Sequence, residues 1–325
     1  MAMKKINNIA TVIVSIMLLA TAFNMYQIKP SEAAVGNVIK TINLDSIINA
    51  TKVFCSIGVA FDGRYLYVDA CDDPNIYKID TDGNLISTFD VVNAGSPVNP
   101  NALAYDAKRN GIWFGGQSCT NDDMPIQFWD FDTNTVTTMF TISSSLNNPA
   151  TSEPFLDACF VDGLAYNEND PNTGADDEIW FSDDINRNIG LFRPNGVLVN
   201  GFNATNIHPS LNTTSGLAIG GSNLYLGNNG GGDVFRADKD TMTLIDQFVH
   251  GDERQEDMEC DPVTFAPIEV MWVRTTPQGG AFNNVLTAYE IEPGTCIIEH
   301  SEGKMYGNGK VVDEETGKHV GLKFN

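Results

Sequence analysis

The chain of 325 residues carries 42 Asp and Glu against 19 Lys and Arg, which gives a formal net charge of −23 at pH 7. The electrostatic field of such a negative protein repels the phosphate backbone of nucleic acids and anionic lipid surfaces, and it favours cations and cationic partners. The composition therefore excludes nucleic-acid binding.

The N-terminal segment has the pattern of a secretory signal peptide. Lys4 and Lys5 precede an apolar run over residues 9–23, and small residues follow up to Ala33. The cationic start, the short apolar run and the small residues at the cleavage site predict a signal peptide over residues 1–33. The mature chain is then secreted into an extracellular or periplasm-like space, with no membrane attachment after cleavage. An uncleaved anchor is the alternative.

Five short segments recur along the rest of the chain and predict the fold. They begin near residues 58, 101, 162, 215 and 256, and read IGVAFD, NALAYD, DGLAYN, SGLAIG and EDMECD. In the first four repeats, further β-runs follow and end near Phe89, Phe140, Phe202 and Phe248. A period of about 40 to 60 residues is that of a propeller blade built from four antiparallel strands.

The two ends of the mature chain complete this pattern. VIKTINL, over residues 38–44, is similar to the outer strand of a blade, and KVVDEETGKHVGLKF near the C-terminus predicts a hairpin. Residues 35–54 and 301–325 together make about one blade, and joining them removes exposed strand edges. Residues 35–325 thus predict a single all-β domain, a β-propeller of six blades whose last blade is closed by both termini. Five blades with a terminal appendage are the alternative.

All cysteines of the chain lie after the predicted cleavage site, and an even number in an exported protein predicts disulfides. They are Cys55, Cys71, Cys119, Cys159, Cys260 and Cys296. Neighbourhood in the sequence favours Cys55 with Cys71, Cys119 with Cys159, and Cys260 with Cys296, although 15 connectivities stay open. No C-x-x-C pair occurs that would indicate a zinc or redox site.

Sequons for N-linked glycans stand at Asn49, Asn203 and Asn212. All three lie near predicted loops, where glycan acceptors are found. They agree with export, and we predict glycosylation at these positions.

The repeats resemble a known group of propellers. The GLA-type first strand, a YLYV or IWFS second strand followed by Asp or Asn, and the segments NIYKIDTDG and NIGLFRPNG are similar to repeats of the NHL, regucalcin/gluconolactonase and strictosidine-synthase-like six-bladed propellers. The resemblance covers most of residues 55–250. Because this superfamily includes lactonases, lyases, cation binders and interaction modules, the resemblance implies a fold rather than an activity.

Polar residues gather at one mouth of such a propeller. Starts of innermost strands and loops after second strands lie on the same face, and these positions supply carboxylates and amides from every repeat. We predict a calcium site formed by Asn101, Asp162, Asp183, Asn228 and Asp257. The resemblance implies that Asn101, Asp162, Asn228 and Asp257 correspond to the cation ligands of lactonase-type relatives, although the first-blade position expected to be Glu is Ser56 or Gly58 here. The alternative is that these residues are ordinary turn formers and caps.

Two classes of function follow from these observations. The first is a secreted, acidic, calcium-stabilised monomer that acts as a binding or surface-interaction module for a small molecule, a glycan or a cell-surface protein. The second is a metal-dependent hydrolase or lyase of the lactonase or esterase-like propeller kind. No G-x-S-x-G segment occurs, so a serine-hydrolase elbow is absent, and no catalytic residue is predicted.

Overall fold

The structure is a computed structural model, and the chain divides into Met1–Ala34 and Val35–Asn325, of which the second is described below. The described residues are 34–48, 58–70, 73–117, 123–155, 161–169, 174, 176–183, 187–211, 214–228, 231–249, 253–277, 285–296, 310–312 and 319–321. The predicted signal peptide, residues 1–33, lies outside them.

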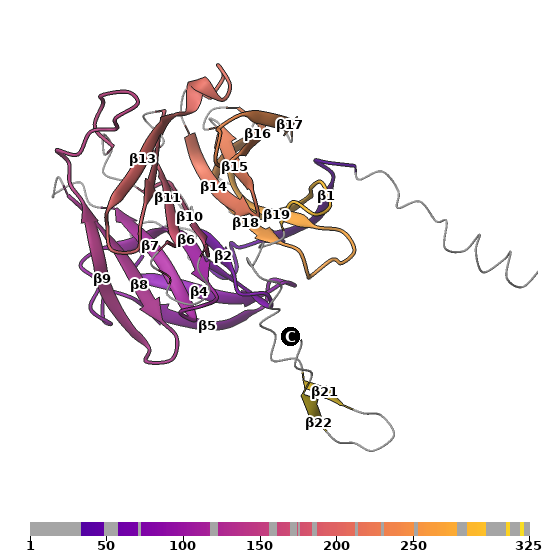
Figure 1. Ribbon diagram of the computed structural model, residues 1–325. Coiled ribbons are helices and arrows are strands. Elements are labelled where there is room, and N and C mark those ends of the chain that lie inside the picture. The colour runs from indigo at the N-terminus through magenta and orange to yellow at the C-terminus, as the bar shows by residue number, and fades with distance from the viewer. Residues whose placement is uncertain are drawn as a thin grey trace, which may run out of the picture. The chain divides into compact units, whose positions relative to one another are not determined.

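The fold is an all-β propeller built from five four-stranded antiparallel sheets (Figure 1). Blade 1 contains β2 (Val59–Phe61), β3 (Tyr65–Asp69), β4 (Asn75–Asp80) and β5 (Leu85–Asp90). Blade 2 contains β6 (Asn99–Asp106), β7 (Gly111–Gln117), β8 (Met124–Asp130) and β9 (Thr135–Ile142). Blade 3 contains β10 (Gly163–Asn167), β11 (Glu178–Ser182), β12 (Asn188–Phe192) and β13 (Leu198–Asn203). Blade 4 contains β14 (Thr214–Gly220), β15 (Asn223–Asn228), β16 (Asp233–Asp238) and β17 (Leu244–Val249). Blade 5 contains β18 (Glu253–Asp261), β19 (Val270–Pro277), β20 (Val285–Glu290) and β1 (Val38–Asn43).

The first strand of each repeat is the innermost strand of its blade. In cyclic order, β2, β6, β10, β14 and β18 contact one another, and β18 contacts β2, so these strands surround a central channel. We call the end at which they begin the upper end, and the end at which they finish the lower end. Second strands run antiparallel to them and therefore finish at the upper end.

The ring is closed by the N-terminal strand. β1 pairs with β20, with Ile42 opposite Leu286, and thereby occupies the outer position of blade 5. The predicted role of VIKTINL as an outer closing strand is confirmed, but the favoured count of six blades is wrong and the alternative of five is right. Because β1 completes the fifth sheet, the N-terminal residues do not begin a sixth.

The predicted C-terminal hairpin is also present. β21 (Lys310–Val312) pairs with β22 (His319–Gly321), and among the described strands these two pair only with each other. They therefore contribute no strand to the last blade, contrary to the expectation that both termini would build it.

Large aromatic side chains fill the space between blades. Trp113, Trp180 and Trp272 occupy equivalent positions on second strands and are almost fully buried. Each indole N–H donates to a carboxylate, on Asp106, Glu178 and Asp261 respectively, at 2.9, 3.2 and 2.9 Å. A buried N–H with a charged partner stabilises by about 1.5 to 3 kcal/mol. The bonds of Trp113 and Trp272 join the second strand to the end of the innermost strand of the same blade, whereas Trp180 and Glu178 both lie on β11.

The described helix, η2 (Ala204–Asn206), is a single 3-10 turn. Within the described part of the chain, no helix is long and apolar enough to cross a membrane.

Candidate functional site

The residues predicted to bind calcium lie together at the upper end of the sheets. Asn101 and Asp257 belong to innermost strands, Asp162 directly precedes one, and Asp183 and Asn228 stand where second strands finish. All five are buried. The structure thus brings all five to the same end of the sheets.

Their hydrogen bonds tie them to the surrounding backbone. The Asn101 amide donates to the carbonyl of Val161 at 3.0 Å, and the backbone N–H of Asn228 donates to Gln255 at 2.8 Å. In the described part of the chain, no three His, Cys, Asp or Glu side chains converge closely enough to hold a metal ion. The calcium site stays a prediction.

Asp257 reaches across the channel from blade 5. Its Oδ2 accepts the backbone N–H groups of Val59 in blade 1 and Leu103 in blade 2, at 3.0 and 3.1 Å. These donors lie on the inner edges of β2 and β6, where no further strand can pair with them. Burial raises the pKa of Asp257 well above its usual value, against the lowering effect of these hydrogen bonds. The side chain thus joins three blades.

An arginine that the sequence reasoning missed lies among the same acidic residues. Arg274, on β19, is buried, and burial lowers its pKa to about 10. The nearby carboxyl groups of Asp69, Glu256 and Asp257 act in the opposite direction. An arginine directly after the apolar run VMWV is the signal that could have revealed it, because a buried guanidinium requires acidic neighbours.

A cavity of about 220 Å³ opens at the lower end of the channel. Its lining comes from the lower ends of innermost strands and the loops after them, in all blades. The lining residues are Phe61, Asp62, Gly63, Tyr105, Ala107, Tyr166, Asn167, Glu168, Ile219, Glu259, Cys260, Pro262, Val263 and Cys296. This surface is mostly apolar and aromatic, and we call it the lower pocket.

Glu259 is the acidic group that the channel brings into the lower pocket. It lies two residues after Asp257 on β18, and its carboxyl group accepts backbone N–H groups from Phe61, Tyr105 and Cys260. Burial, with a smaller contribution from Asp261, raises the pKa of Glu259 to about 8 against the lowering effect of the three N–H donors. The carboxyl group is therefore protonated at neutral pH while the pocket holds no cation.

The repeat pattern contained the signal for both channel carboxylates. Where the fifth repeat has Asp257, the others have Gly58, Ala102, Gly163 and Gly216. Where it has Glu259, they have Ala60, Ala104, Ala165 and Ala218. At one of these positions a small residue is required by close backbone approach: a Cβ on Gly216 would lie 3.0 Å from the Cα of Asp257.

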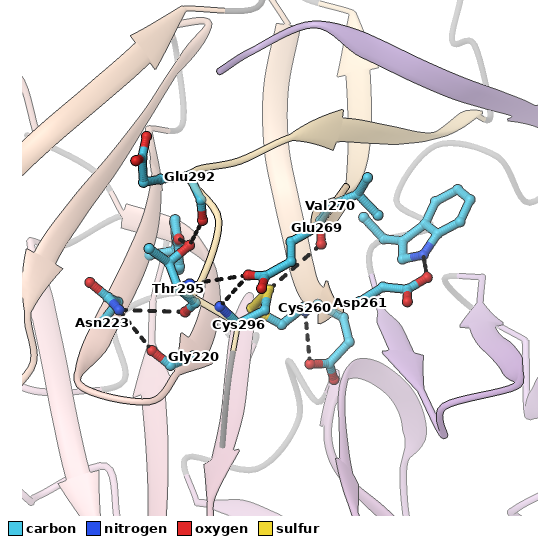
Figure 2. Close-up of a disulfide and its surroundings, with 12 residues drawn as sticks. Gly220, Asn223, Cys260, Asp261, Glu269, Val270, Glu292, Thr295 and Cys296 are labelled. Carbon is cyan, nitrogen blue, oxygen red and sulfur yellow. Dashed lines mark hydrogen bonds between the residues drawn. A yellow bond between two sulfur atoms is a disulfide. The ribbon is translucent and has the colours of Figure 1, made fainter. Parts of the chain in front are cut away.

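A disulfide and a carboxylate hold the wall of the lower pocket in place (Figure 2). Cys260 at the end of β18 is bonded to Cys296, as predicted. The Glu269 carboxylate accepts the backbone N–H groups of Gly294, Thr295 and Cys296, at 2.9, 3.1 and 3.0 Å. Figure 2 shows Glu269 beside Cys296, so the segment carrying this cysteine is fixed on both sides.

The remaining predicted modification sites are only partly described. Cys55, Cys71, Cys119 and Cys159 lie outside the described residues, as do Asn49 and Asn212. Asn203 ends β13, and its Oδ1 accepts the backbone N–H and the hydroxyl of Thr205 at 3.0 and 2.7 Å. Glycosylation of all three asparagines stays a prediction.

The architecture is similar to that of solved structures. Glutaminyl cyclase from Myxococcus xanthus superposes with a TM-score of 0.50 and 11% identity, over 79% of this chain and 96% of that one. A chain of a mitotic checkpoint complex gives a TM-score of 0.40 and 12% identity, over 72% of this chain and 63% of that one. The chain matches no family model and no curated protein. At this identity the similarity shows the β-propeller fold alone, and membership of the NHL and regucalcin group stays a prediction.

Proposed function

We propose that this protein is an exported binding protein for a small molecule, and that its ligand lies in the lower pocket. The carrying observation is the pocket itself: about 220 Å³ of space, an apolar and aromatic lining, and one carboxyl group whose pKa is displaced to about 8. A well-formed apolar pocket with few polar groups is the usual form of a small-molecule site.

The alternative function is a metal-dependent hydrolase or lyase, and the residues at the upper end of the sheets give it less support. Catalysis by a metal requires ligands that leave one coordination position open to the substrate. At the upper end, Asp257 already accepts two backbone N–H groups, and Arg274 provides positive charge next to it. Binding at the lower end therefore accounts for more of the geometry.

Calcium stabilisation and export belong to the same proposal. The signal-like N-terminus and the Cys260–Cys296 disulfide support export, because disulfides persist in oxidising compartments. Calcium at the upper end predicts a higher melting temperature in calcium than in chelator, and loss of most of that gain in Asp162→Asn. Equal melting temperatures in both buffers would remove calcium from the proposal.

A blocked pocket tests the binding function. Val263 lines the lower pocket and is half exposed, so Val263→Trp should fill the opening without disturbing the core. Val249→Trp, on the outer strand β17, is a matched control because Val249 is also exposed and does not line the pocket. Small aromatic and aliphatic fragments, screened by soaking and by melting temperature, should bind the wild type and the control but not Val263→Trp. Fragments that bind all three proteins equally would overturn the proposal.

A further inference from the structure

The lower pocket is rich in groups that attract positive charge. Its ionisable carboxyl groups are Asp62, Glu168 and Glu259, and no Lys, Arg or His occurs among its described lining residues. Phe61, Tyr105 and Tyr166 add aromatic rings. Carboxylates and ring faces both attract cations, and ring faces favour organic ammonium groups in particular.

Two basic residues close to this lining in the structure have carboxylate partners. The Arg109 guanidinium lies 2.7 Å from Asp106 and 3.1 Å from Asp177. The Lys78 ammonium lies 3.6 Å from Asp62 and over the Tyr65 ring, at 4.2 Å from its centre. Lys78 is therefore paired with one carboxylate of the pocket lining, Asp62, whereas Arg109 is paired with two carboxylates outside the lining, and neither has a described interaction with Glu259.

Asp62 is held by its own turn, which distinguishes it from Glu259. Its Oδ1 accepts the backbone N–H groups of Arg64 and Tyr65, at 2.9 and 2.6 Å, and its Oδ2 accepts the Tyr67 hydroxyl at 2.8 Å. Glu259 has three backbone donors but no cationic partner in any described interaction. It is the carboxyl group to which a ligand can add the missing positive charge.

Within the described part of the chain, the ionisable groups that share the lower pocket with Glu259 or flank it on β18 are acidic or phenolic. Asp257 and Asp261 flank it on β18, Asp62 follows β2, Tyr105 lies on β6 and Glu168 follows β10. Burying a carboxylate without an opposite charge costs free energy, so burial favours the protonated form of Glu259. A cation placed against it would favour the ionised form instead.

We propose that the ligand of the lower pocket is a small organic cation, whose ammonium group pairs with the Glu259 carboxylate and packs against the rings of Phe61, Tyr105 and Tyr166. This inference rests on the proposed binding function. When the cation binds, the O–H bond of the protonated Glu259 carboxyl group breaks and one proton leaves to solvent. The net charge of −23 favours the approach of such a ligand.

A ligand of permanent charge tests this proposal by calorimetry. Benzyltrimethylammonium does not titrate, so any pH dependence of its affinity belongs to the protein. Because only the ionised form of Glu259 is competent, affinity should rise about tenfold per pH unit up to the pKa of about 8 and level off above it. Titrations in buffers of different ionisation enthalpy should show about one proton released per cation bound below that pH.

Two variants separate the contribution of the Glu259 carboxylate to cation affinity from the contribution of the protein's net charge. Glu259→Gln should lose the pH dependence and most of the affinity for benzyltrimethylammonium, yet still bind benzyl alcohol, which shows that its pocket is intact. Glu292→Gln is the matched control, because Glu292 is exposed, lies outside the pocket lining and points away from the disulfide in Figure 2. It should bind the cation as the wild type does.

The outcomes distinguish this inference from the function on which it rests. If benzyl alcohol or benzoate binds the pocket more tightly than the cation at pH 8, or if Glu259→Gln keeps the pH-dependent affinity, the ligand is not a cation but the binding function stands. If no probe of any charge binds in a manner that Val263→Trp blocks, both proposals fail.

Discussion

Asp257 and Glu259 stand two residues apart on β18, yet the two ends of the channel give them different roles. Both accept backbone N–H groups from the inner edges of β2 and β6. Asp257 is fully buried and lies near Arg274 and the acidic side chains of Asp69 and Glu256. Glu259 has the same kind of backbone partners but also lines an open pocket.

A carboxyl group that accepts N–H groups from unpaired strand edges joins three blades at Asp257, and in our proposal the same kind of group binds the ligand at Glu259. What differs is the space beside the group and the charge near it. At the upper end a guanidinium is already present, whereas no described basic residue lines the lower pocket. We expect substitutions at the upper end to change folding, and substitutions at the lower end to change mainly ligand affinity.

The disulfide is the exception at the lower end, and its removal should have the largest effect. Cys260 and Cys296 are separated by 36 residues, and closing a loop of this length stabilises by about 3 to 4 kcal/mol. The double variant Cys260→Ala/Cys296→Ala should lose about that free energy of unfolding in urea titrations. A loss below about 1 kcal/mol would show that Glu269 and its hydrogen bonds hold the pocket wall without the crosslink.

Loss of the Asp257 side chain should destabilise almost as much. In Asp257→Ala, the N–H groups of Val59 and Leu103 lose their acceptor inside the channel, which should lower the free energy of unfolding by about 2 to 3 kcal/mol. Asp257→Asn keeps a neutral acceptor and should cost about 1 kcal/mol or less. Equal losses in the two variants would mean that the charge of Asp257, rather than its hydrogen bonds, stabilises the ring.

Glu259 should make stability depend on pH. The folded protein holds its proton up to about pH 8, whereas the unfolded chain releases it near the ordinary value of 4.5. Between these values the folded state binds more protons, so rising pH should lower the free energy of unfolding by about 1 kcal/mol per unit. Glu259→Gln should remove this contribution, while that of Asp257, whose pKa is also raised, remains. Parallel curves for wild type and variant, measured by melting from pH 5 to 8, would refute this role.

The rim of the lower pocket should tolerate change most easily. Val263 is half exposed, so Val263→Ser should alter the free energy of unfolding by less than about 0.5 kcal/mol. It should nevertheless weaken the binding of benzyltrimethylammonium, because the side chain lines the pocket. A stability loss above about 1 kcal/mol, with affinity unchanged, would assign Val263 to the fold instead of the site.

The sequence predicted the blades well because each repeat supplies one complete unit. The five recurring segments correspond to β2, β6, β10, β14 and β18, the innermost strands. The predicted number of six blades is wrong because the pattern assigns VIKTINL to an additional blade. In the structure this segment is the outer strand of the fifth sheet. Local pattern identifies an outer strand but not the sheet in which it pairs.

The candidate site was harder to predict. The sequence predicts a calcium site at the upper end, because Asp and Asn residues recur there at the starts of innermost strands and after second strands. The lower pocket combines residues as distant as Phe61, Tyr166 and Cys296, and no single window of sequence contains it. Glu259 could have been noticed as the one acidic residue at a position where the other four repeats have Ala. The pocket volume beside it depends on packing between blades, which the pattern does not specify.

The pairing of β1 with β20 also sets the order in which the molecule can fold. Blades 1 to 4 are each made from consecutive strands and can form as they leave the ribosome or a translocation channel. β1 must wait, unpaired, until residues 285–290 have emerged. Since non-local pairing of this kind slows folding, ring closure should be the last and slowest step, and the interval before it is when the edges of β1 and β20 are open to aggregation.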